Sequence, residues 1–271
     1  MSNMNIDSIL QRSLSKVNKQ INKSLERLAT GLKINNAGDD AAGLALSTGM
    51  NSRIRGLNQA NSNIQTGINV LSIAGDSLNS IGSSLQKLKE LSVQAANGLY
   101  SDSERAVLQA EADQIIEHIK QTKDSTKFND IKLFGDSTSQ SAEIVLQIGD
   151  STESSSSITL DTSLDITDIS VDLSSGEASR ESIDKIEALL GEVNDKIAYV
   201  GANSNILESI VESNEIKIEN LSDAKSIIMD TDIAKETSNL VHNQILADAT
   251  TSLMVQNNNN EYQLMKILIG F

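Results

Sequence analysis

Apolar residues recur every three or four positions over most of the chain, and this spacing predicts long amphipathic helices. The first stretch should form a helix of about 25 residues. Its apolar stripe comprises Ile6, Leu10, Leu14, Val17, Ile21, Leu25, Leu28 and Leu32. A basic row beside the stripe comprises Arg12, Lys16, Lys19, Lys23 and Arg27. The first helix therefore carries one apolar stripe and one charged row.

A short polar segment interrupts the helical pattern. It reads LKINNAGDDAAGLALS, from Leu32 to Ser47. The Asn-Asn and Gly residues favour a loop, and Asp39 or Asp40 can cap the helix that follows. We therefore expect one helix to end here and a longer one to begin.

The longer helix carries apolar residues at strict seven-residue spacing, which is typical of coiled coils. This column comprises Met50, Leu57, Ile64, Leu71, Leu78 and Leu85. A matching column late in the chain comprises Ile186, Val193, Val200 and Leu207, with Asn214 the polar residue in register. Because each stripe needs an apolar partner and the chain turns back, we expect the two columns to face each other in antiparallel helices.

Between these columns the apolar period changes. Ser101 and Glu104 have the spacing of a capping box and should open another helix. The runs AEIVLQIG and SITLDTSLDI then predict a small β-hairpin region at about 128–166. The segment 167–178 is mostly polar and its structure stays open. The fold class is therefore mainly α, with long antiparallel coiled-coil-like helices and one small β region.

The final stretch from Thr231 to Phe271 returns to helical spacing. Its apolar stripe comprises Ile233, Leu240, Ala247 and Met254. A single stripe on a terminal helix cannot be hidden by that helix alone, and isolated helices are marginal in water.

The composition excludes several kinds of chemistry. The 271 residues include no Pro, Cys or Trp, and aromatic residues make up 2%. Disulfides, thiolate metal sites and a Cys nucleophile are therefore absent. His118 and His242 are far apart in the sequence and have no ligand-spaced partners. We expect no catalytic, cofactor-binding or metal-binding residue and no enzymatic activity.

The charge is strongly negative but unevenly distributed. The net charge is −15, which argues against a nucleic-acid partner. Residues 1–60, however, contain eight Lys and Arg against four Asp and Glu. The basic row could be a solvated face, or it could pair with acidic neighbours in an assembly. A membrane-surface helix is a further alternative, but the acidic remainder and the lack of Trp or Phe on that helix count against it. We expect no membrane partner.

Two ordered sets of motifs indicate a known family. Near the N-terminus stand ERLATGLKINNAGDDAAGLAL, from Glu26 to Leu46, and TKFNDIKLF, from Thr126 to Phe134. Near the C-terminus stand VGANSNIL, NLSDAKSIIMDTDIAKETSNL and NQILADATTSLMVQ, between Val200 and Gln256. Over nearly its whole length the chain resembles bacterial flagellin, in a short form without the large variable outer domains. A hook-filament junction protein is the alternative function, but it would not be expected to carry DDAAGLA and SDAKS together.

The resemblance implies a structural subunit that polymerises into the flagellar filament for swimming motility. Residues 1–41 and 231–271 would form an inner helical pair, and residues 42–230 an outer rod. The assembly stripe would comprise Leu10, Leu14, Val17, Ile21, Leu25, Leu28, Ile233, Leu240, Ala247 and Met254. The chain lacks a hydrophobic leader, so we expect secretion by the type III flagellar export route.

Partners are also implied by the resemblance. They are other copies of the chain, an export chaperone, the filament cap and junction proteins, and a host innate receptor. The candidate receptor contacts are Gln86, Lys87, Glu90, Leu91 and Glu111. Many receptor-activating flagellins have Arg where this chain has Lys87, and Lys lacks the planar fork of Arg. We therefore expect weak or modest receptor signalling.

Overall fold

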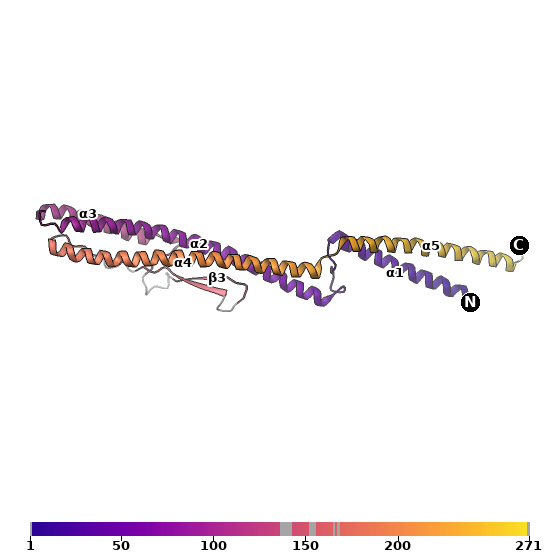
Figure 1. Ribbon diagram of the computed structural model, residues 1–271. Helices are drawn as coiled ribbons and strands as arrows, with labels where there is room; N and C mark the ends of the chain where they lie inside the picture. The colour runs from indigo at the N-terminus through magenta and orange to yellow at the C-terminus, as the bar shows by residue number, and fades with distance from the viewer. Residues whose placement is uncertain (1, 136–142, 152–155, 165, 167–168, 270–271) are drawn as a thin grey trace. The chain divides into compact units, whose positions relative to one another are not determined.

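The computed structural model describes residues 2–135, 143–151, 156–164, 166 and 169–269, with side chains for all of these except 2–5, 143, 268 and 269. The helices are α1 (Ser2–Thr30), α2 (Ala41–Ala95), α3 (Asp102–Ser125), α4 (Gly176–Met229) and α5 (Ile233–Ile269). The strands are β1 (Lys127–Phe128), β2 (Ile131–Lys132), β3 (Glu143–Gln147) and β4 (Ser157–Asp161). The mainly helical fold predicted from the sequence is confirmed (Figure 1).

The chain divides into two compact units. The first contains residues 1–54 and 219–271, and the second contains residues 55–218. Both long helices, α2 and α4, continue from one unit into the other. The first unit therefore includes the start of α2 and the end of α4, which the sequence analysis placed in the rod. The domain boundaries expected from the sequence, after residue 41 and after residue 230, lay instead close to the breaks between consecutive helices.

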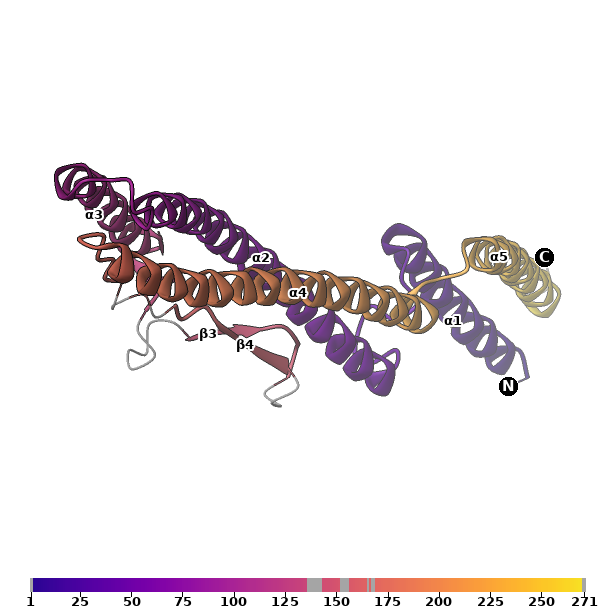
Figure 2. The same cartoon turned by 60° about the vertical axis from the view of Figure 1, so that its left-hand side comes forward.

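In the second unit, α2 and α4 lie side by side and run antiparallel (Figures 1 and 2). A Cβ placed on Gly75 would lie 3.5 Å from Val200 Cγ1, and one on Gly82 would lie 3.7 Å from Val193 Cγ1. The partner on α4 thus moves back by one heptad as α2 advances by one heptad. Two heptads before Gly75, the Asn214 amide Nδ2 donates to Asn61 Oδ1 at 3.0 Å. The heptad register therefore holds along the helix pair.

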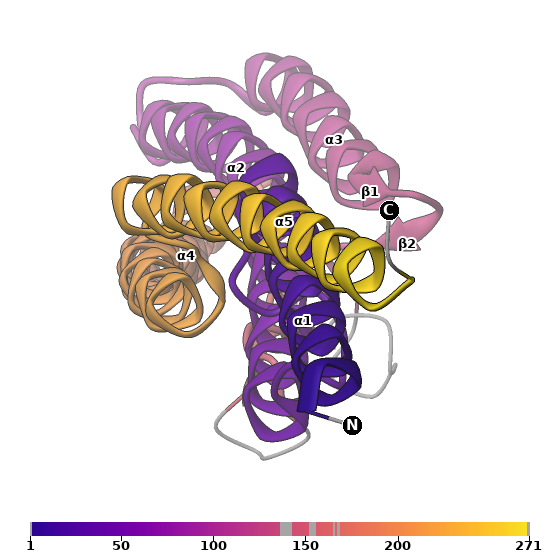
Figure 3. The ribbon, with the colours of Figure 1, turned by 90° about the vertical axis from the view of Figure 1, so that its right-hand side faces the viewer.

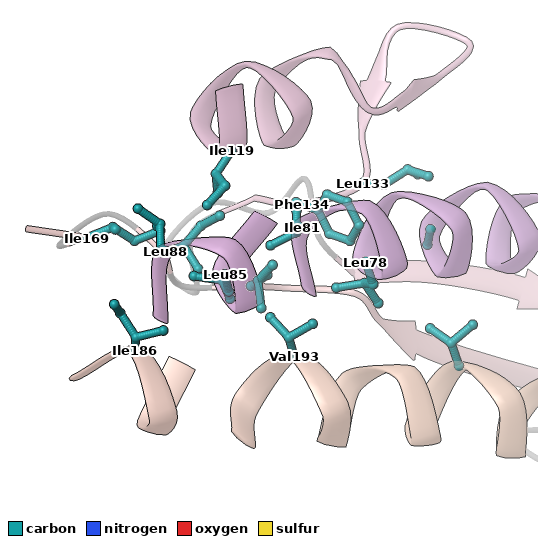
Figure 4. Packing of buried hydrophobic residues seen from close by; sticks show 14 of the residues in the cluster. Leu78, Ile81, Leu85, Leu88, Ile119, Leu133, Phe134, Ile169, Ile186 and Val193 are labelled. Carbon is teal, nitrogen blue, oxygen red and sulfur yellow. The ribbon is translucent and has the colours of Figure 1, made fainter. Parts of the chain in front are cut away.

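The two heptad columns form the centre of the core. Every member of the two columns that lies in the second unit is buried, and Val200 is the most exposed of them at 7%. These members are Leu57, Ile64, Leu71, Leu78, Leu85, Ile186, Val193, Val200 and Leu207. Met50, in the first unit, is half-buried. Figure 4 shows Ile186 and Val193 of α4 directed toward the α2 residues Leu78 and Leu85. The apolar columns thus pack against each other along the helix pair.

Helix α3 covers another side of α2 and begins at the expected capping box. Ser101 Oγ accepts a hydrogen bond from the Glu104 backbone N–H, and Glu104 Oε2 accepts one from the Ser101 N–H. The inner face of α3 buries Leu108, Ala112 and Ile119, and Ile119 points toward the α2 side chains in Figure 4. The capping box predicted from the sequence is therefore confirmed.

Among the described residues between α3 and α4 there are two hairpins, where the sequence analysis expected one. Strands β3 and β4 pair antiparallel with Val145 opposite Thr159, within the region expected to form a hairpin. The Asn63 amide of α2 donates to Gln147 O at 3.3 Å, so this hairpin lies against the rod helices (Figure 2). The smaller β1–β2 hairpin turns at Asn129 and Asp130, which both have positive φ angles. Such angles at both central positions fit a tight primed turn.

The segment before α4 is strand-like although it pairs with no strand among the described residues. Alternate side chains at Ile169, Val171 and Leu173 are buried in the core. Gln109 of α3 clamps this segment, because its amide donates to Val171 O at 2.9 Å and accepts from the Leu173 N–H at 2.7 Å. The alternation of apolar and polar residues from Ile169 to Leu173 is a local signal for an extended segment, although the sequence analysis left this segment open.

Candidate assembly surface

The terminal helices α1 and α5 pack side by side in the first unit (Figure 3). The residues of the pairing face on α1 are Leu10, Leu14, Val17, Ile21, Ser24 and Leu28, all buried or half-buried. On α5 they include Glu236, Leu240, Asn243, Ala247, Thr250 and Met254, with the same burial. Ser24 bonds Glu236, and Asp7 bonds Asn257, so the helices run antiparallel. Most of the predicted terminal stripe therefore lies on this face.

Two members of the predicted assembly stripe, Leu25 and Ile233, lie outside this face. Leu25 is 48% exposed and Ile233 is 52% exposed. The heptad position that contacts α5 is occupied by Ser24, which is 3% exposed, so Leu25 is turned to the flank of α1. Ile233 is the first residue of α5 and precedes Glu236, where the pairing face begins. Within one chain both side chains thus remain available to another surface.

The pairing face contains polar contacts as well as apolar ones. The Ser24 hydroxyl donates to Glu236 Oε1 at 2.6 Å, and both residues are buried. Arg27 Nη1 lies 3.7 Å from Glu236 Oε2, while Arg27 Nε is buried without a hydrogen-bond partner. Among the described large apolar side chains of the two pairing faces, only Val17 is buried, at 7% exposure, and the others are half-buried. The α1–α5 pair consequently buries little apolar surface of its own.

Helix α5 exposes large apolar side chains on several faces. Those exposed are Ile233, Val241, Ile245, Leu246, Leu253, Val255, Tyr262, Leu264, Met265 and Ile267. Between Thr237 and Asn260 the sequence has one charged residue, Asp248. A helix that is apolar on most faces is normally buried on most faces. The chain therefore presents a surface that monomeric proteins rarely leave in water.

A short pair of crossing segments joins the terminal helices to α2 and α4. Helix α1 ends at Thr30, and the next residue, Gly31, has a φ of 72°, a left-handed conformation that suits glycine just after a helix. Thr231 N–H then donates to Gly31 O at 2.9 Å, and Lys33 N–H donates to Met229 O at 2.5 Å. The segment between α1 and α2 and the segment between α4 and α5 are thus hydrogen-bonded to each other as an antiparallel bridge.

The paired aspartates after this bridge have separate roles. Asp40 caps α2, because its Oδ1 accepts from the Gly43 N–H at 2.9 Å. Asp39 instead folds the loop: its Oδ2 accepts from the N–H groups of Asn35 and Asn36, each at 3.2 Å. Lys23 Nζ lies 2.5 Å from Asp39 Oδ1. The hydrogen bond from Lys23, followed by the bond from the Asn35 backbone, lowers the pKa of Asp39 to about 2.

The loop should consequently resist acid until well below the usual range of an aspartate. The ionised form makes these contacts, so Asp39 stabilises the loop above its ordinary pKa of 3.8, and the stabilisation is lost as pH falls through about 2. We expect the Asn35 and Asn36 amide resonances to titrate near pH 2 in an NMR experiment, and this transition to be absent from Asp39→Asn. A shared midpoint near pH ~4 would contradict the assigned contacts.

The candidate receptor contacts lie on two helices. Gln86, Lys87 and Glu90 are exposed on α2, and Glu111 is exposed on α3. Lys87 Nζ lies 3.4 Å from Glu90 Oε2. Leu91 is only 3% exposed and belongs to the core, so it can support such a surface from beneath but not contact a receptor. The expectation for Leu91 as a direct contact is corrected accordingly.

No catalytic or metal centre emerges from the described part of the chain. Within it, no three His, Cys, Asp or Glu side chains gather as metal ligands. His118 and His242 are both exposed. None of the helices, over the residues described, is apolar for long enough to cross a bilayer.

Comparison with known proteins identifies the family. Residues 1–139 match the bacterial flagellin N-terminal helical region, and residues 183–268 match the bacterial flagellin C-terminal helical region. A flagellin of Halalkalibacterium halodurans is 36% identical over 252 residues, which are 91% of each chain. The flagellar filament 33 kDa core protein of Treponema phagedenis is 33% identical over 273 residues, covering 95% of this chain and 96% of the relative.

A solved structure supports the fold. The crystal structure of Bacillus cereus flagellin has a TM-score of 0.50 and 23% sequence identity, and the match covers 56% of this chain and 88% of that chain. Together with the two family matches and the relatives, the helical architecture shows that the chain belongs to the bacterial flagellin family, and thus that it is a structural, non-enzymatic subunit of the flagellar filament used for motility.

Proposed function

We propose that α1 and α5 form the inner layer of the filament and that residues 42–230 form the outer rod. The observation that carries this proposal is the apolar surface of α5, which α1 covers on one side only. Stacked copies would bury the remaining sides, and burial stabilises by about 25 cal/mol for each Å² of apolar surface. The acidic rod is better suited to a water-facing layer.

A map of assembled filaments by electron cryo-microscopy tests this arrangement directly. We expect α1 and α5 nearest the filament axis, with neighbouring copies contacting the exposed apolar residues of α5. The bridge between Leu32 and Asp230 would lie between the layers. A map with α5 facing solvent on the outside of the filament would contradict the proposal.

The exposed α5 surface also supports a proposal about delivery. Before assembly, an apolar helix of this kind needs a cover, and an export chaperone bound to 233–269 would provide one. The chain would then leave the cell by type III flagellar export and meet the cap and junction proteins at the filament. A chain ending before Ile233 should not co-elute with the cognate chaperone in size-exclusion chromatography, whereas the full chain should.

The solvent-accessible side chains of Gln86, Lys87, Glu90 and Glu111 support the proposal of a host-receptor surface on the rod. They lie on α2 and α3 outside the apolar core. A lysine at position 87 can make point-charge contacts but cannot make a bidentate planar contact. The same side chain also pairs with Glu90. These features favour weak recognition.

Replacing this lysine should strengthen recognition. We expect Lys87→Arg to raise receptor signalling about tenfold, because a second charged hydrogen bond adds roughly 1.5 kcal/mol. Reporter-cell assays with purified monomer measure the effect. Lys89→Arg is the matched control, since Lys89 pairs with Glu187 at 2.6 Å and should not reach the receptor. Unchanged signalling by Lys87→Arg would show that this contact does not limit recognition.

A further inference from the structure

The basic row of α1 lies on the side of the helix away from α5, except at its last member, Arg27, whose Nη1 lies 3.7 Å from Glu236 Oε2 of α5. Its members, Arg12, Lys16, Lys19, Lys23 and Arg27, follow one another at steps of four, three, four and four residues. Such steps keep side chains on one face of a helix for about 22 Å. The first four are exposed and Arg27 is half-buried. The row is therefore a continuous charged face.

Contacts within the chain involve Arg12 at one end of this row and Lys23 and Arg27 toward the other, where Arg27 pairs with Glu236. Arg12 donates to Ser8 one turn earlier, and Lys23 pairs with Asp39. Lys16 and Lys19, at the centre, have no ion pair or hydrogen bond with any residue that the structure describes. At the far end, the partnerless Arg27 Nε lies beside a polar groove of about 390 Å³ between α1 and α5. The face thus has free donors that an acceptor could satisfy.

Helix α4 carries an acidic row with the same spacing. It comprises Glu208, Glu212, Glu215, Glu219 and Asp223, again at steps of four, three, four and four. All five side chains are exposed, and none forms an ion pair with another described residue. The one cation within the span of this row, Lys217, is two residues from both Glu215 and Glu219 and so lies on the other side of the helix. The other acidic run on α4, between Glu177 and Asp195, is interrupted by cations.

We propose that the basic row of α1 in one copy docks on the acidic row of α4 in a second copy within the filament. This inference rests on the proposed filament function. Because both rows have steps of four, three, four and four in the same order, they match when the two helices run parallel, with Lys16 opposite Glu212 and Lys19 opposite Glu215. Matching charge patterns of this kind fix register and reject wrong neighbours more than they add raw affinity. The contact also relieves repulsion between copies that each carry a net charge of −15.

Other anionic partners fit the row less well. The described part of α1 has no aromatic side chain that could stack on bases or anchor at a lipid interface. The strongly acidic remainder of the chain would also be repelled by nucleic acid and by anionic lipid. A second copy supplies five carboxylates at the spacing of the five cations.

A charge swap in the full-length chain tests the docking. We expect Lys16→Glu with Lys19→Glu, and separately Glu212→Lys with Glu215→Lys, each to raise the critical concentration for polymerisation about tenfold. All four changes together should restore it to within about threefold, because the opposed charges match again. Glu192→Lys with Asp195→Lys changes the charge of α4 equally outside the row and should leave polymerisation unchanged.

Zero-length carbodiimide cross-linking supplies an independent measurement. Filaments assembled from a mixture of unlabelled and isotope-labelled chains should yield a Lys19–Glu215 peptide pair of mixed isotope content, which marks a contact between copies. Failure of the fourfold variant to recover would overturn the proposal, as would an exclusively same-chain link. Loss of binding to anionic phosphatidylglycerol vesicles in Lys16→Glu with Lys19→Glu, with polymerisation unaffected, would assign the row to a membrane instead. If the unsubstituted chain formed no polymer, the filament function itself would fail.

Discussion

Leu71→Ala should lower the free energy of unfolding of the second unit by about 2 to 5 kcal/mol, the usual cost of truncating a fully buried leucine. Leu71 is 0% exposed and lies in the middle of the heptad column that faces α4. Its neighbours are held in register by long helices, so they cannot easily collapse into the cavity. Urea denaturation followed by circular dichroism would measure the loss.

A control variant at a nearby residue distinguishes the loss of buried contacts from a change in helix propensity. Ile73 lies on the same helix but is 38% exposed, so Ile73→Ala should cost less than about 1 kcal/mol. Both variants introduce the same residue within one helical turn. If their unfolding free energies fell equally, the heptad column would not be the element that holds α2 to α4.

Much of this architecture could be predicted from the regular spacing of residues along the sequence. The seven-residue columns between Leu57 and Leu207 could be found because each apolar residue has the same neighbours one heptad away. The capping box at Ser101 and Glu104 could be found because both partners lie within one turn. Asn214 also fits, since its amide donates to Asn61 Oδ1 and Ile148 O, which satisfies a buried polar group in the column.

What the sequence could not reveal depends on contacts from elsewhere in the chain. The segment from Ile169 to Leu173 is held by Gln109, which lies 62 residues before Val171, and no local pattern indicates such a clamp. The β1–β2 turn at Asn129 and Asp130 has a local signal, an Asn-Asp pair that tolerates positive φ, but its strands are too short to show a period.

Glycines on α2 lie where neighbouring elements approach the helix closely. Gly75 and Gly82 face α4, whereas Gly67 faces the β3–β4 hairpin, where an added Cβ would overlap Leu146. Helical spacing places all three glycines near one face of α2. Which neighbour covers each depends on where the hairpin lies, and that is a property of the tertiary structure.

The terminal helices also show that the sequence alone does not reveal which side chains meet in the tertiary structure. An apolar stripe that runs through Ile21 and Leu25 is a poor guide to which side chains meet inside one chain, because Ser24 takes the contact position and Leu25 remains exposed. The stripe is wider than the α1–α5 contact. The extra width is understandable if the rest of it is buried by other copies.

Leu25→Asp should therefore abolish polymerisation while leaving the monomer intact. Leu25 is 48% exposed, so it contributes little to the stability of a single chain. The free energy of unfolding of the second unit should therefore change by less than about 0.5 kcal/mol. In a filament whose copies bury this flank of α1, the same change places a carboxylate in an apolar contact repeated at every subunit. Burying an unpaired charge costs several kcal/mol, which raises the critical concentration more than about 100-fold.

Asn22→Asp is the matched control, because it adds the same charge to an exposed polar position of α1. Sedimentation of polymer and melting of monomer should be measured on both variants. We expect Asn22→Asp to pellet like the unsubstituted chain and Leu25→Asp to stay in the supernatant with an unchanged melting curve. If Leu25→Asp instead polymerised normally, the exposed flank would be a solvent-facing surface. If it lowered the melting temperature of the second unit as much as Leu71→Ala does, the two units would unfold as one, and the division between inner pair and rod would not hold.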